Sequence, residues 1–100
     1  MSEALRRARA LGVAVEFADL GEWGVDELRS EYDPQGPKIR VNLRIAEHLA
    51  SGELGEFISL AVGHELYHHR ERIGEVARLE NRATREFAAN EYARSLLALD

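Results

Sequence analysis

The sequence contains no cysteine, and its apolar residues never form a long run. The absence of cysteine excludes a disulfide framework and every zinc site built on thiolates, so any bound metal must use histidine and carboxylate ligands. No apolar stretch approaches the length of a membrane span, and the charged segment at residues 1–10 lacks the apolar core of a signal peptide. We therefore expect a cytoplasmic protein.

Basic charge is also scarce. The 13 lysine and arginine residues are outnumbered by 18 acidic residues, which gives a net charge of -5. Phosphates repel an acidic domain, and the one basic cluster, at residues 6–9, is typical of a solvated helix face, so we expect no direct binding of nucleic acid. With 100 residues, of which 45% are apolar and 31% charged, the chain fits one globular domain over residues 1–100.

The first half of the chain predicts one helix followed by strands. Ser2 and Gly12 are suitable caps for the two ends of the helix. The alternation of apolar residues and the turn signals between them indicate strands that can form a short antiparallel sheet of about three strands. The expected elements are a helix at residues 3–11 and strands at residues 13–17, 25–32 and 38–43.

The second half reads as helical almost throughout, which makes the predicted fold class α+β. A short helix is expected first, closed by Ser51 and Gly52, then a longer helix that contains a histidine pair, then a final helix. The sheet would pack on the second and third of these helices. Their expected ranges are residues 44–50, residues 53–70 or 56–70, and residues 78–97.

Residues 64–68 read His-Glu-Leu-Tyr-His and carry the clearest chemical signal. Positions four apart lie one turn apart on the same face of a helix, so His64 and His68 can reach one metal ion. Glu65 lies one position further round, where it can take a proton from a water at the metal without being a ligand. The pattern predicts a Zn²⁺ site with Glu65 as catalytic base, although such donors also accept manganese or iron.

A catalytic zinc normally has three protein ligands, and the third should be a carboxylate because no histidine follows closely. Glu86 is favoured since it begins Glu86-Phe87-Ala88-Ala89-Asn90, whose small alanines would let two helices approach each other. Asn90, one turn further on, can hydrogen-bond a ligating histidine and fix its ring. The other downstream candidates are Glu71, Glu75, Glu80 and Glu91.

The motif at residues 64–68 with residues 86–90 resembles the gluzincin pattern of zincin-like metallopeptidases. Together with Ile39-Arg40-Val41-Asn42 and the run at residues 86–97, it is similar to the ImmA/IrrE family. This resemblance implies a small zincin-like domain with His64, His68 and Glu86 as ligands and Glu65 as base. It also implies a zinc-dependent metallopeptidase that cuts a protein partner, such as a helix-turn-helix repressor or an antitoxin-like regulator.

Several expectations about the cleft remain open. The substrate is expected to add a strand beside residues 38–43. The group that stabilises the oxyanion is not identified, with Tyr32, Tyr67, His69 and Tyr92 as candidates, although His69 is expected to face solvent. The alternative function is a catalytically inactive zincin-like domain that acts as a metal-stabilised protein-binding module.

Overall fold

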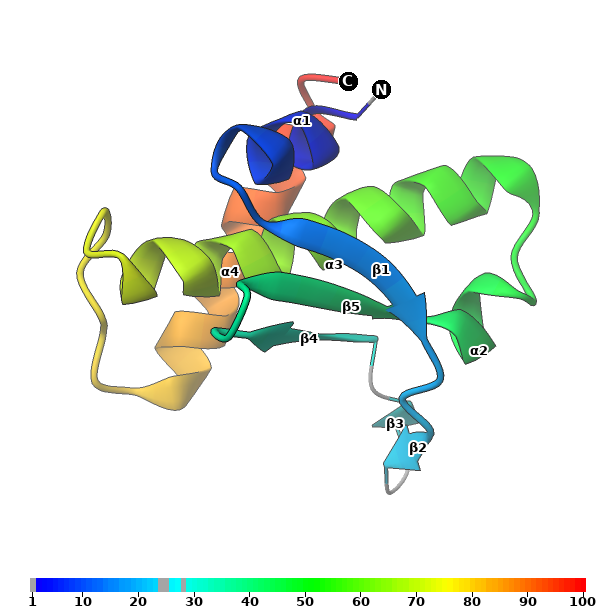
Figure 1. The fold of residues 1–100 in the computed structure, drawn as a ribbon, viewed down its shortest axis with the longest axis horizontal. Coiled ribbons are helices and arrows are strands. Elements are labelled where there is room, and N and C mark those ends of the chain that lie inside the picture. Colours follow the sequence, from blue (N-terminus) through cyan, green and yellow to red (C-terminus); the bar gives the residue numbers. More distant parts are fainter. Residues whose placement is uncertain (1, 24–25, 28) are drawn as a thin grey trace.

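Three strands form the main sheet of the computed structural model, which describes residues 2–23, 26–27 and 29–100 (Figure 1). The central strand is β5 (Lys38–Asn42), with β1 (Ala14–Ala18) parallel on one side and β4 (Ser30–Asp33) antiparallel on the other. Ile39 and Val41 of β5 are fully buried, as their alternation with polar residues predicts. With helices against this sheet, the α+β class is confirmed.

The prediction of an antiparallel sheet is wrong, because the pairing of β1 with β5 makes the sheet mixed. Apolar alternation indicates which face of a strand is buried but carries no information about the direction of its neighbours. The chain between β1 and β4 forms a separate antiparallel pair of short strands, β2 (Glu22–Trp23) and β3 (Asp26–Glu27). The strand predicted at residues 25–32 is thus divided between β3 and β4, and positions 25 and 28 lie outside the described residues.

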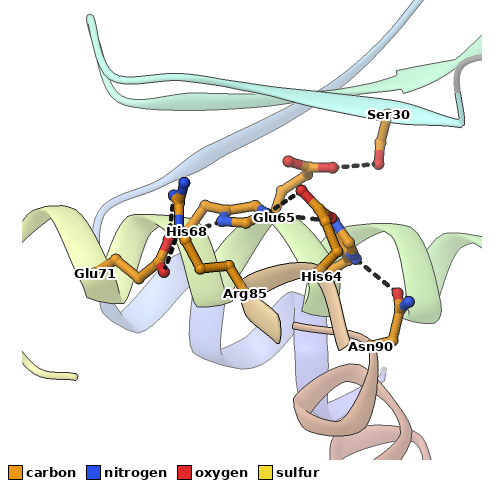
Figure 2. Close-up of polar contacts among 8 residues, drawn as sticks. Ser30, His64, Glu65, His68, Glu71, Arg85 and Asn90 are labelled. Carbon is orange, nitrogen blue, oxygen red and sulfur yellow. Dashed lines mark hydrogen bonds and ion pairs between the residues drawn. The ribbon is translucent and has the colours of Figure 1, made fainter. Parts of the chain in front are cut away.

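The strand expected to lie beside a substrate is also in a different place. β5 occupies the middle of the sheet and is paired on both sides, so it offers no free edge. The edge strands are β1 and β4, and β4 contacts the helix α3 (Ser51–Arg72) through the hydrogen bond from Ser30 to Glu65 (Figure 2). An added strand beside α3 would therefore pair with β4.

The remaining helices are α1 (Glu3–Ala10), α2 (Leu43–Ala46) and α4 (Arg82–Leu97). Ser2 caps α1 as predicted, since its Oγ accepts a hydrogen bond from the Leu5 N–H at 3.1 Å. The final helix starts later than predicted because the side chain of Asn81 caps it. Residues 51 and 52, expected to close the preceding helix, instead begin α3. No helix among the described residues is both long and apolar enough to cross a membrane.

The core lies between the sheet, α1 and the middle of α3. Val62 and Leu66 of α3 are fully buried in the same cluster as Ile39 and Val41. The two ends of the chain lie side by side in Figure 1, where the backbone N–H of Glu3 donates to the Asp100 carboxylate at 2.7 Å. The sheet packs on α3 as predicted, but the prediction that it also packs on the final helix is wrong, because α4 packs on α3 and α1 instead.

α3 and α4 touch at Gly63, where the absence of a side chain lets the two backbones come together. A Cβ at this position would lie 2.8 Å from Cα and 2.9 Å from Cβ of Ala93. Any larger residue at either position would separate the helices. The contact of Gly63 with Ala93 sets how closely α4 approaches the histidine pair. Of the two alanines expected to allow this approach, Ala89 is fully buried.

We predict that Gly63→Ala lowers the free energy of unfolding by about 1–3 kcal/mol, the usual cost of overpacking a well-packed contact. Gly55→Ala is the matched control, because a Cβ at this position of the same helix meets nothing within 4 Å. It should raise stability by about 0.5–1 kcal/mol through the unfolded chain alone. Urea unfolding of the two variants measures both changes, and equal effects would show that the helix contact is not tight.

Candidate metal centre

His64 and His68 of α3 direct their rings toward one point, and Glu86 of α4 reaches the same point. The two Nε2 atoms lie 3.3 Å apart. The carboxylate of Glu86 lies 2.7 Å from Nε2 of His64 and 3.6 Å from Nε2 of His68. The sequence-predicted ligands from two helices are therefore brought together, with the imidazoles mostly buried and Glu86 partly exposed.

The opposite nitrogen of each ring is bound by a different side chain (Figure 2). Nδ1 of His64 lies 2.7 Å from Oδ1 of Asn90, and Nδ1 of His68 lies 2.8 Å from Oε1 of Glu71. An amide oxygen and an ionised carboxylate can only accept, so both Nδ1 atoms are the donors. Asn90 thus has the contact predicted from the sequence.

These contacts leave the Nε2 lone pairs of neutral imidazoles facing each other and the Glu86 carboxylate. Three acceptors at such distances repel one another unless positive charge lies among them. Protons on the imidazoles would satisfy this requirement, and so would a divalent cation. The donor set, two neutral nitrogens and one carboxylate, is one of those that hold catalytic zinc, and it also suits iron.

The spacing also suits a metal ion. Ligands about 2.0–2.1 Å from a tetrahedral zinc lie about 3.3 Å from one another. The separation of the two Nε2 atoms, 3.3 Å, matches this edge, and the distances of 2.7 and 3.6 Å to Glu86 lie on either side of it. Ligand atoms of His64, Glu65 and His68 all lie within 4.8 Å of one another and could hold a metal ion.

Glu65 has an environment that separates it from the other carboxylates. Its side chain is buried beneath β4, and the hydroxyl of Ser30 donates a hydrogen bond of 2.7 Å to its Oε2. Burial raises the pKa of Glu65, while the hydrogen bond from Ser30 and the neighbouring histidines oppose that rise. The carboxyl group of Glu65 therefore lies within 4.8 Å of the histidine ligand atoms, in surroundings that raise its pKa.

Glu71 is the carboxylate whose contact sequence reasoning missed. The sequence offered it as a candidate ligand, but in the structure it touches Nδ1 of His68 instead of the converging Nε2 atoms. Arg85 of α4 holds it with two hydrogen bonds of 2.9 and 3.0 Å. This guanidinium, more than the contact with His68, lowers the pKa of Glu71 to about 2, so the carboxylate stays ionised.

The expectation that His69 faces solvent is wrong. It is 95% buried, with a relative exposure of 5%, and its Nδ1 lies 2.6 Å from the Tyr32 hydroxyl on β4. Ser30 and Tyr32 are two positions apart on β4 and therefore lie on the same face of the strand. Glu65 and His69 lie one turn apart on α3, so the two hydrogen bonds join the strand and the helix at matching positions. Tyr32 and His69 thus have a structural contact in the described fold.

The other sequence candidates have their contacts elsewhere than at the converging Nε2 atoms. Tyr67 packs against Tyr92 and against the ring of His68, with ring centroids 6.0 and 6.2 Å apart. Glu75 pairs with Arg70, and Glu91 pairs with Arg94. Glu80 is exposed on the segment before α4. Among these glutamates, Glu86 is the one whose carboxylate contacts both histidines through Nε2.

Two residues of the site, Ser30 and Arg85, were not singled out from the sequence, and Glu71 was considered only as a metal ligand and not as a partner of His68 Nδ1. The spacing of Glu71 from His68, three positions on one helix, was a usable signal, because such residues are neighbours on the helix surface. Ser30 and Arg85 gave no local signal, since each reaches the site from another element and depends on how β4 and α4 pack on α3.

Comparisons with protein-family models, curated proteins and solved structures found no match for the chain. The description of the centre therefore depends on its geometry alone, and membership of the ImmA/IrrE family is a prediction from the motifs at residues 64–68 and 86–90.

We predict that Glu71→Gln lowers the affinity for zinc by about 10- to 100-fold, because the variant no longer holds His68 with a charged acceptor. Competition with a chromophoric chelator measures this affinity. Glu75→Gln is the control, since its carboxylate pairs with Arg70 on the surface near the same helix end. Equal affinities of wild type and both variants would contradict a supporting role for Glu71.

Proposed function

We propose that the protein is a zinc-dependent metallopeptidase that hydrolyses a peptide bond in a protein partner. The observation that carries this proposal is the meeting of three acceptor groups, from His64, His68 and Glu86, beside the buried carboxylate of Glu65. A structural metal site is closed by protein ligands on all sides, whereas three ligands leave one position for a reacting group. The small zincin-like architecture implied by the motif resemblance is consistent with this arrangement.

Zinc is the proposed metal because two imidazoles and one carboxylate are its usual catalytic ligands. When bound, it supplies a Lewis acid that polarises a carbonyl oxygen and lowers the pKa of water. Asn90 and Glu71 orient the two rings so that Nε2 of each is the ligating atom. Tight contacts of this kind reduce the reorganisation that metal binding would require.

Glu65 is the proposed general base. It would accept a proton from the attacking water and deliver it to the leaving nitrogen, which requires a pKa nearer to neutrality than that of an exposed glutamate. Burial raises its pKa in this direction. The hydroxyl of Ser30 orients the carboxylate by donating to Oε2, which leaves the other oxygen, Oε1, for the water.

The substrate is proposed to lie extended along the free edge of β4. Among the residues that the structure describes, this strand pairs with β5 alone, and its Ser30 contacts the proposed base, so a peptide paired to its other edge would pass over the site. The motif resemblance favours a helix-turn-helix repressor or antitoxin-like regulator as the partner and the cytoplasm as the location. An extended backbone, rather than a folded surface, is what such an edge binds.

We predict that wild-type protein binds one zinc ion and that Glu65→Gln retains the metal but loses peptide cleavage by about 100- to 10,000-fold, the usual contribution of a general base. Elemental analysis measures zinc content, and cleavage of a denatured protein such as casein measures activity. Glu47→Gln, at an exposed position that ends α2, is the control and should cleave like wild type.

The same assays with Glu86→Ala and Glu91→Ala test the third ligand. Glu86→Ala should bind zinc much more weakly, whereas Glu91→Ala loses only a surface pair with Arg94 and should bind it normally. Zinc binding without cleavage by wild type, with candidate repressors also left intact, would favour the metal-stabilised binding module. Failure of wild type to bind any divalent metal would exclude both functions.

A further inference from the structure

A cavity of about 480 Å³ opens directly beside the metal centre. His64, Glu65 and Asn90 form its wall on the side of the proposed reaction. The volume falls within the range of pockets that bind small molecules and single side chains of a ligand. A group inside the cavity would therefore lie next to the atoms at which a peptide bond would be cut.

The rest of the wall is mainly apolar. Its apolar part is formed by Phe57, Leu60 and Ala61 from α3 and Ala93 from α4, and Ser30 of β4 adds a hydroxyl. Ala61 and Ala93 are buried, and their small side chains leave the space that larger residues would fill. An apolar surface that is partly open to water gains free energy when an apolar side chain covers it. The shape and chemistry of this wall suit a large aliphatic or aromatic side chain.

The mouth of the cavity carries positive charge. Arg29 and Arg94 both line it, but Arg94 is already paired with Glu91. Arg29 is exposed, and no ion pair within the described part of the chain involves it. It also lines a second, adjoining cavity of about 360 Å³, whose wall includes Glu53 and Glu56. A carboxylate would thus be attracted near Arg29 and repelled further along α3.

We propose that this cavity is a specificity pocket that takes a large apolar side chain next to the scissile bond, with Arg29 binding a carboxylate close to that side chain in the same peptide. This inference rests on the proposed peptidase function and adds the class of substrate. Leu60 lines both cavities, so the size of its side chain determines how much space the pocket offers. Arg29 controls the charge preference, and its contribution is modest because it is exposed.

Peptide binding to Glu65→Gln protein, supplied with one equivalent of zinc, tests the pocket independently of catalysis. The probe is a fluorescein-labelled peptide with blocked ends and a central leucine between two glutamates, measured by fluorescence anisotropy. Replacing the leucine with alanine should weaken binding at least about 10-fold. Replacing both glutamates with glutamine should weaken it about threefold. A glutamine-flanked peptide with a free carboxylate directly after the leucine distinguishes a terminal from a side-chain carboxylate.

Two further substitutions, each made in the Glu65→Gln protein, connect these preferences to the named residues. Leu60→Trp should fill the pocket and abolish the preference for leucine, whereas Leu99→Trp, at an exposed position outside the pocket, should retain it. Arg29→Gln should abolish the preference for a carboxylate, and Arg9→Gln, an exposed arginine of α1, should not. Circular dichroism would verify that each variant is folded.

Equal binding of the leucine and alanine peptides would overturn the pocket, as would a leucine preference that survives Leu60→Trp. A carboxylate preference that survives Arg29→Gln would overturn the assignment to Arg29. These outcomes are distinct from failure of the peptidase proposal. Wild-type protein that shows the predicted binding preferences but cuts none of the peptides would contradict the enzyme and leave the pocket supported.

Discussion

The close contact of α3 with α4 is the constraint on which the centre depends. His64 and His68 belong to one helix and would lie one turn apart in any helical segment. Glu86, Asn90 and Arg85 belong to the other helix, and their positions follow from the approach of Gly63 to Ala93. Without that approach the histidine pair would lack both its third partner and the side chains that orient its rings.

Three glutamates close to the same two imidazoles have different environments, and the environment explains the part each can play. Glu65 is buried with a single hydroxyl donor, which leaves it able to accept a proton. Glu71 is held by the Arg85 guanidinium and stays ionised, so it is suited to fixing His68. Glu86 is partly exposed and faces both Nε2 atoms, the position expected of a ligand.

The sequence predicted the parts of this centre that a single helix determines. The pair His64 and His68, with Glu65 beside it, follows from helical spacing alone. Glu86 and Asn90 were predicted from the small residues of the segment 86–90 and from the resemblance of this segment to a zincin motif. Ser30 and Arg85 could not be predicted in this way, because their contacts arise only when separate elements pack together. The direction of β1 was also missed, since the burial of Ile39 and Val41 on β5 is compatible with a parallel or an antiparallel neighbour.

Anomalous diffraction at the zinc absorption edge, from crystals grown with zinc, tests the central claim most directly. The account predicts one strong peak about 2.0–2.2 Å from Nε2 of His64, Nε2 of His68 and a carboxylate oxygen of Glu86, with the Nδ1 contacts to Asn90 and Glu71 retained. A map without a peak at this point, or with Glu65 in place of Glu86 as ligand, would contradict it.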